Sequence, residues 1–196
     1  YMPVFESAAM IPPQTRREAL TEVRAQLDTV SGSILNIRVG GNDLSHAFGL
    51  RRPANRTIYD LRPVADILID IVAAFGTQYV VSGPVWEYYS GEGWEEGLRR
   101  EMELDLLNGF TGKTVIHPNQ IPVVNEMLRV SQQDYADARA ILNWDTGSGS
   151  LVSASEDGGR MNEYNTHEPL GRQLAVGRHL RGLQGRQRHV GLRPTL

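Results

Sequence analysis

The chain has 196 residues, of which 40% are hydrophobic and 22% charged, a composition typical of a globular domain with an apolar core. No apolar run approaches the roughly 20 residues that a membrane span requires, and no signal-peptide pattern is present. The absence of cysteine excludes disulfides and thiolate metal sites and fits a reducing compartment. We therefore expect a cytoplasmic protein with no membrane partner.

Short apolar runs typical of strands alternate with segments whose apolar residues have helical spacing. The predicted strands are residues 2–6, 34–41, 78–85 and 113–118. The predicted helices are residues 15–30, 59–76, 93–110, 119–128 and 131–144. This alternation predicts an α/β fold with a parallel sheet, and because the strands are apolar nearly throughout, we expect helices to cover both faces. A doubly wound sheet and a (β/α)8 barrel both satisfy this pattern.

The net charge of −3 is unevenly distributed along the chain. Residues 171–196 contain six arginines and no acidic residue. A basic segment of this kind can bind nucleic acid. This one has no aromatic residue and no sustained apolar period, which favours a disordered end or an out-of-frame translation instead. Residues 146–159 are small and polar, which predicts a flexible connector.

Polar residues stand where the predicted strands end, which is where parallel α/β folds place their functional groups. Glu6 ends the first strand, and Asp43 follows the second. Two carboxylates at the same edge of neighbouring strands form a hard oxygen site suited to Mg²⁺, which prefers one or two carboxylates and leaves other positions to water and substrate. The alternative is that Glu6 is a solvated strand end and that Asp43 is the N-cap of a short helix.

Two further groups at the strand ends are candidates for binding a substrate. Gly40 and Gly41 leave the backbone free of side chains, so that N–H groups near Asn42 can reach a substrate carboxylate or a developing enolate oxygen. His117 and Pro118 end the fourth predicted strand. The alternative for His117 is a hydrogen bond to the backbone at the entrance of the next helix.

Several of these segments are similar to one known family. The segment "GFTGKTVIHPNQIPVVNEML" at 109–128 resembles the histidine–proline segment of citrate lyase β-subunit-like proteins, which belong to the larger HpcH/HpaI aldolase family. The segments "VFES" and "RVGGNDLSHAFGL" resemble the family's metal-binding glutamate after strand 5 and its aspartate segment after strand 6. The segments "GGNDLSH" and "EDGGRMNE" are similar to the branch of carbon–carbon bond lyases associated with tellurite-resistance gene clusters.

The resemblance implies a (β/α)8 TIM barrel, of which this chain supplies about strands 5 to 8, a C-terminal helix and a tail. Residues 1–145 would form the C-terminal half of the barrel. Residues 146–170 would form the connector and a C-terminal segment, and residues 171–196 the basic tail. The start at Tyr1, within a strand, leads us to expect that the sequence begins inside a domain.

For function, the resemblance implies Mg²⁺ held by Glu6 and Asp43, with the amides of residues 41–43 binding a carboxylate. The family makes or breaks carbon–carbon bonds next to a carbonyl, often in acyl-CoA thioesters, through a metal-stabilised enolate. We therefore expect a lyase that acts on a small oxo acid or a CoA thioester and forms a homo-oligomer at full length. The family's substrate-binding arginine would lie outside this chain, so the fragment alone is expected to be inactive. The alternatives are a non-catalytic binding or regulatory module and, more weakly, association with nucleic acid.

Overall fold

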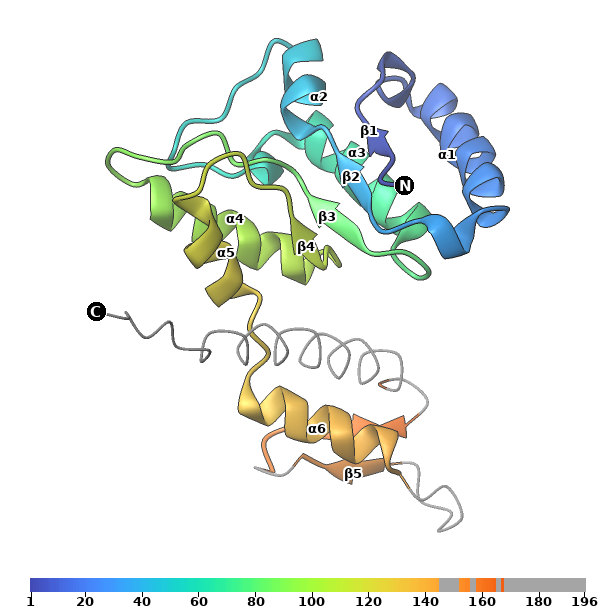
Figure 1. Ribbon diagram of the computed structural model, residues 1–196, viewed down its shortest axis with the longest axis vertical. Helices are drawn as coiled ribbons and strands as arrows, with labels where there is room; N and C mark the ends of the chain where they lie inside the picture. The colour runs from blue at the N-terminus through green and yellow to red at the C-terminus, as the bar shows by residue number, and fades with distance from the viewer. Residues whose placement is uncertain (145–151, 156–157, 165–166, 168–196) are drawn as a thin grey trace, which may run out of the picture. The chain divides into compact units, whose positions relative to one another are not determined.

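The computed structural model describes residues 1–144, 152–155, 158–164 and 167 (Figure 1). The chain divides into two compact units, Tyr1–Leu128 and Arg129–Leu196. This division falls earlier than the boundary expected near residue 145. Among the described residues, no helix combines the length and apolar character that crossing a membrane would take.

A parallel sheet of four strands organises the first unit, with the strands side by side in chain order (Figure 1). The strands are β1 (Val4–Phe5), β2 (Ile37–Val39), β3 (Val81–Gly83) and β4 (Gly112–Lys113). Their register pairs Val4 with Arg38, Arg38 with Ser82, and Ser82 with Gly112. The sequence placed these strands in the correct order, but each is shorter than predicted. The last strand ends at Lys113, so His117 and Pro118 lie in the loop beyond it.

Five α-helices follow or connect these strands. They are α1 (Pro13–Asp28), α2 (Gly41–Ala47), α3 (Arg62–Phe75), α4 (Trp94–Leu107) and α5 (Gln120–Met127). Short 3-10 helices are η1 (Ala8–Met10), η2 (Ser31–Ser33) and η3 (Ile58–Asp60). The helix expected over 59–76 begins only at Arg62, because a capping box between Thr57 and Asp60 closes the preceding turn η3.

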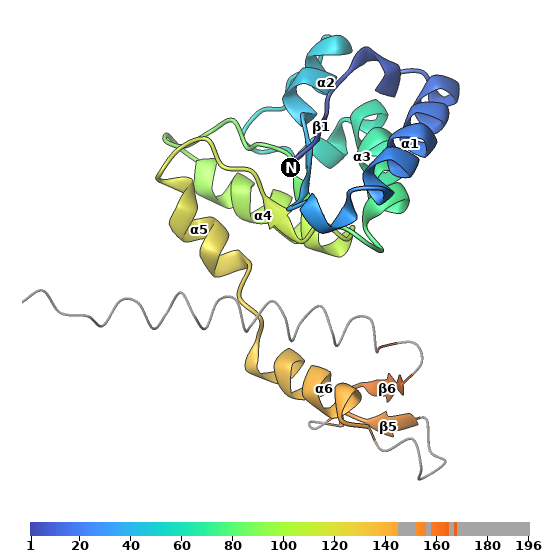
Figure 2. The ribbon, with the colours of Figure 1, turned by 45° about the vertical axis from the view of Figure 1, so that its right-hand side comes forward.

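The helices α1 and α3 lie side by side in Figures 1 and 2 and cover one face of the sheet. Their apolar residues pack with the strand residues that point to this face, including Phe5, Ile37 and Val39. Phe75 on α3 lies against Phe5, with ring centroids 5.0 Å apart. A second apolar cluster joins α4 and α5 to the loop after β3 and contains Trp86, Leu98, Met102, Val123 and Val124.

The opposite face of the sheet is polar, contrary to the expectation of strands buried on both sides. Side chains alternate along a strand, so Arg38 and Ser82 point away from the apolar core. Asn36 donates to the Ser82 hydroxyl at 2.9 Å, and Arg38 Nε lies 3.4 Å from Thr114 Oγ1. Helices on one face and strands in sequential order distinguish this sheet from a doubly wound one, which carries helices on both faces.

The second unit contains one helix and one hairpin. Helix α6 (Gln132–Leu142) begins as predicted, with the Ser131 hydroxyl accepting from the N–H of Asp134. Strands β5 (Val152–Ala154) and β6 (Met161–Glu163) pair antiparallel. Arg160 donates to Asp134 and Asp137 at 3.1 and 3.0 Å, which ties the hairpin to the helix.

The hairpin differs from the flexible connector expected over 146–159. Residues 152–154 form strand β5 because they find a partner strand at 161–163, which composition alone did not indicate. The remaining parts of that connector, and the basic tail at 171–196, lie outside the described residues.

Candidate functional site

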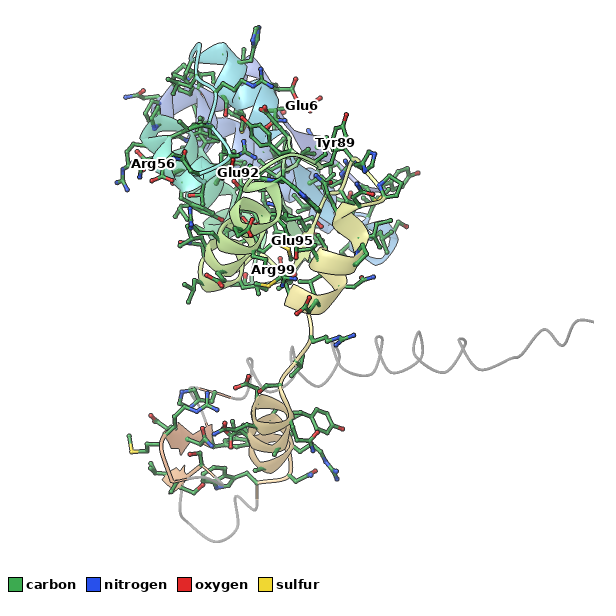
Figure 3. The ribbon with its side chains drawn as sticks, turned by 90° about the vertical axis from the view of Figure 1, so that its left-hand side faces the viewer. Glu6, Arg56, Tyr89, Glu92, Glu95 and Arg99 are labelled. Atoms are coloured by element: carbon green, nitrogen blue, oxygen red, sulfur yellow. The ribbon has the colours of Figure 1, made fainter. Side chains whose placement is uncertain are left out.

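The carboxylates of Glu6 and Asp43 both lie close to Gly40, at the carboxyl ends of β1 and β2. A Cβ atom placed on Gly40 would lie 2.5 Å from Oε2 of Glu6 and 3.3 Å from Oδ2 of Asp43. Cβ of Glu6 is also 2.5 Å from this position, so the two oxygens lie close to one point that the Glu6 side chain can approach only because residue 40 is glycine. Both side chains are exposed, and Figure 3 shows Glu6 projecting at the surface.

Local structure explains why these two carboxylates converge. Glu6 directly follows Phe5, which points into the core, so strand alternation turns Glu6 to the opposite face. Gly40 bonds back to β1 through its N–H, which donates to Phe5 O at 3.0 Å. Asp43 lies in the first turn of α2, not at its N-cap, which is Gly40. The interpretation of Asp43 as an N-cap is therefore wrong.

The first turn of α2 leaves backbone donors at the same place. The first bond inside this helix runs from Leu44 N–H to Gly40 O at 3.0 Å. The N–H groups of Gly41, Asn42 and Asp43 precede it and have no carbonyl within the helix to bond. Backbone donors and two carboxylates thus lie at one end of the sheet, as the sequence predicted.

The donor set suits a hard divalent cation. Neither Glu6 nor Asp43 forms an ion pair within the part of the chain that the structure describes. No cluster of three or more His, Cys, Asp or Glu occurs among the described residues either. Two carboxylates without a nitrogen or sulfur ligand match the preference of Mg²⁺, which fills its other positions with water and substrate oxygens.

An open cleft of about 510 Å³ reaches Asn42, the residue before Asp43 in the chain, although neither Glu6 nor Asp43 lines it. Residues from α2, the following loop, the loop after β3 and the loop after β4 form its walls. They are Asn42, His46, Gly49, Leu50, Arg51, Glu87 and Ile116. Arg51 and Glu87 form an ion pair of 2.8 Å on this wall. The cleft connects the predicted residue Asn42 to the loop of His117 and Pro118 through Ile116, and to Arg51 and Glu87, which the sequence analysis did not associate with a site.

His117 and Pro118 belong to a loop that is bound to the loop after β3. The ring of His117 stacks on Tyr89 with centroids 4.1 Å apart, and its Nδ1 accepts from Asn119 N–H at 3.2 Å. This hydrogen bond is the alternative that we considered from the sequence. Gln120 donates to the carbonyls of Trp86 and Tyr88 at 2.8 and 2.9 Å. No described contact joins His117 to Glu6 or Asp43.

Behind the site lies a buried network of charges that the sequence analysis missed. Glu101 on α4 pairs with Nε of Arg52 and with Nζ of Lys113, each at 2.8 Å. Asp105, one turn later, accepts from Lys113 at 2.7 Å and from the hydroxyl of Tyr59 at 2.7 Å. The available signal was the spacing of two acids, four residues apart, on the same side of α4 as buried Leu98 and Met102.

The charges in this network balance, which explains how they are tolerated in the interior. Burial by itself would lower the pKa of Lys113, but Asp105 and Glu101 raise it above its ordinary value. Burial, followed by the charge of Asp105, raises the pKa of Tyr59. Lys113 therefore remains a cation and Tyr59 a neutral donor through the physiological range.

Three comparisons with known proteins point to the same family. Residues 1–176 match the family described as C-C_Bond_Lyase of the TIM-Barrel fold. L-malyl-CoA/beta-methylmalyl-CoA lyase of Cereibacter sphaeroides is 38% identical over 74 residues, which are 37% of this chain and 22% of that protein. The crystal structure of CitE from Mycobacterium tuberculosis, in complex with magnesium, acetoacetate and coenzyme A, aligns with a TM-score of 0.51 and 26% identity.

The alignment with CitE covers 74% of this chain and 52% of CitE, so the chain spans about half the length of that protein. The family match covers most of the chain and agrees with a parallel sheet whose strands lie in sequential order. The chain belongs to the carbon–carbon bond lyases of the TIM-barrel fold, a family of citrate lyase β-subunit-like proteins.

Proposed function

We propose that this chain carries the metal-binding part of a Mg²⁺-dependent carbon–carbon bond lyase that acts on a small oxo acid or an acyl-CoA thioester. The observation that carries the proposal is the convergence of Glu6 and Asp43 at Gly40. Two similar proteins support the proposal. The CitE structure contains magnesium, acetoacetate and coenzyme A, and the lyase of Cereibacter sphaeroides is named for its malyl-CoA thioester substrates.

In this proposal Glu6 and Asp43 hold the ion. Bound there, Mg²⁺ would stabilise negative charge that develops on a substrate oxygen when a carbon–carbon bond next to a carbonyl is broken. The two carboxylates suit this role because they are accessible and have no protein cation beside them among the described residues. Gly40 contributes because, without a Cβ atom, it lets the Glu6 side chain pack against its backbone, where Oδ2 of Asp43 also approaches.

The substrate carboxylate would bind the start of α2. The N–H groups of Gly41, Asn42 and Asp43 can donate to its oxygens without competition from helical carbonyls. His117 and Pro118 remain predicted substrate-binding residues. Their contacts support an indirect contribution, since this loop anchors the loop that carries Glu87 and so shapes one wall of the cleft.

We further propose that the working enzyme is a closed barrel in which these four strands represent strands 5 to 8. Strands β1 and β4 each have one neighbour among the described residues, and a TIM barrel has eight strands and no edge. Tyr1, Met2 and Ile116 near these edges are at least half exposed, as expected of surface that another part of a barrel would cover. The arginine that family resemblance calls for would come from the other strands. On this proposal the 196-residue chain by itself does not turn over substrate.

The test compares two aspartate variants in the protein expressed at the length that its gene encodes. Asp43→Asn removes a charge from the site, whereas Asp66→Asn removes one from the exposed pair of Arg62 and Asp66, whose atoms lie 3.9 Å apart. Titration calorimetry should show Mg²⁺ affinity reduced by about tenfold or more in the first variant and unchanged in the second. Equal effects of both substitutions would exclude this metal site. Loss of a 2-oxo acid or a thioester, assayed in parallel, tests the lyase activity.

A further inference from the structure

Arg52 is a buried arginine that joins three segments around the cleft. Its side chain is 1% exposed. Nη1 donates to Oδ1 of Asn42 at 3.1 Å, and Nη2 donates to the carbonyl of Val85 at 2.6 Å. Nε pairs with Glu101 at 2.8 Å, and the guanidinium lies 5.2 Å from the ring centre of Trp86. The start of α2, the loop after β3 and helix α4 are therefore held by one side chain.

The contact with Arg52 determines which way the amide of Asn42 points. A guanidinium has donors only, so the atom of Asn42 that faces it must be the oxygen. The amide nitrogen then points away from Arg52. Among the residues that the structure describes, no acceptor bonds this nitrogen, and Asn42 lines the cleft beside Asp43. Two N–H donors of known orientation are thus available at the site.

The guanidinium has little freedom to release the amide. Its partner Glu101 is fully buried and is itself held by Lys113 and by the N–H of Ile58, at 2.8 Å each. Rotation of the guanidinium would leave Glu101 as a buried charge without its arginine, which is strongly unfavourable. The orientation of Asn42 is therefore fixed before any ligand arrives.

We propose that Arg52 is a positioning residue that presents the amide N–H groups of Asn42 to an acceptor oxygen of the substrate. The ligand chemistry that this arrangement recognises is a carboxylate or a carbonyl oxygen next to the metal position. The inference rests on the proposed function for the identity of the site, and it adds a neutral side-chain donor to the backbone donors of α2. A neutral donor is suited to this place because Glu6 and Asp43 already supply the negative charge that balances a cation.

Substitution of Asn42 by Asp separates the two roles of this residue. The new carboxylate can still accept from Arg52, so the link to the buried network is kept, but it has no N–H to donate and it repels an anion. Arg52→Lys keeps the N–H groups of Asn42 but removes their positioning. One ammonium cannot donate to Asn42, Val85 and Glu101 in the three directions that the guanidinium provides, so the amide of Asn42 is free to rotate. Asn55→Asp introduces the same charge at an exposed position and serves as the control.

The experiment uses pyruvate as the probe and the protein expressed at the length that its gene encodes. Calorimetry in the presence of Mg²⁺ should show pyruvate affinity reduced by about tenfold or more in Asn42→Asp and unchanged in Asn55→Asp. The melting temperature of Asn42→Asp should stay within a few degrees of the parent value. Unchanged pyruvate affinity in Asn42→Asp would overturn the proposal.

A second measurement does not depend on the metal site. In the nuclear magnetic resonance spectrum of the metal-free protein, the side-chain N–H pair of Asn42 should give one sharp pair of signals. In Arg52→Lys this pair should move toward the positions of a freely rotating amide, whereas Asn55→Asp should leave it unchanged. If the Asn42 signals are the same in the parent and in Arg52→Lys, the positioning role is excluded. If Mg²⁺ fails to bind while these signals respond as expected, the metal proposal fails and the positioning role stands.

Discussion

The Asp105 carboxylate packs directly against Gly83, where a Cβ atom on residue 83 would lie 2.4 Å from Oδ2 of Asp105. The carboxylate cannot move aside, because the same oxygen accepts from Lys113 at 2.7 Å and the other accepts from Tyr59 at 2.7 Å. Glycine at this position in β3 therefore allows α4 to bring its charged residues against the sheet.

Gly83→Ala should lower the free energy of unfolding by about 1–3 kcal/mol, the usual cost of forcing extra atoms into a packed interior. Gly32→Ala is the matched control, because nothing lies within 4 Å of the Cβ that it would add. Its effect should stay within about 0.5 kcal/mol. Urea denaturation of both variants measures the difference, and equal stabilities would show that the Asp105 carboxylate is free to shift.

Lys113 is the only lysine in the sequence, and its side chain is fully buried between two carboxylates. Lys113→Met should cost about 3–5 kcal/mol of unfolding free energy, since Glu101 and Asp105 would lose their shared cation. Arg62→Met, in an exposed pair with a separation of 3.9 Å, should cost less than about 1 kcal/mol. Chemical denaturation compares the two, and a similar small loss in both would contradict the charge balance described for the interior.

Alkaline pH should destabilise the fold through Lys113 and Tyr59. Both have a pKa raised in the folded state, so above about pH 10 the unfolded chain loses these protons first. The folded state then binds more protons, and its stability falls by about 1.4 kcal/mol per pH unit for each group. The stability that these groups contribute is complete below their ordinary pKa values and is lost as the pH rises above them.

Tyr59→Phe removes one of the two titrating groups. The slope of the free energy of unfolding against pH should therefore fall by the contribution of one proton, about 1.4 kcal/mol per pH unit. Denaturation curves recorded from about pH 9 to about pH 11 measure the slope in both proteins. An identical slope would show that Tyr59 ionises equally in the folded and unfolded states.

Much of the site could be predicted from the sequence because it depends on local rules. Strand alternation places Glu6 opposite the core residue Phe5, and parallel neighbours bring the ends of β1 and β2 to one edge. Gly40 remains a predicted substrate-binding residue, and the structure adds that the Glu6 side chain occupies the space where its Cβ atom would lie. The alternation of periodicity predicted four parallel strands, whereas their side-by-side order in the sheet was implied only by the resemblance to a barrel family.

The parts that the sequence did not predict depend on contacts between distant residues. Arg52 and Glu101 are 49 positions apart, and no periodicity relates them. The polar face of the sheet was missed although the sequence signalled it, since Asn36 and Arg38 alternate with the core residues Ile37 and Val39. The strand predicted at 113–118 was too long, since its apolar residues Val115 and Ile116 are exposed in the loop after β4.

The central claim is that Glu6 and Asp43 bind one divalent cation. The most direct test is a crystal of the protein grown with Mn²⁺ in place of Mg²⁺, measured at a wavelength where manganese scatters anomalously. We expect one anomalous peak in contact with Oε2 of Glu6 and Oδ2 of Asp43, close to the backbone of Gly40. We also expect this peak to be absent from crystals of Asp43→Asn. A peak bound elsewhere, or the same peak in the variant, would contradict the claim.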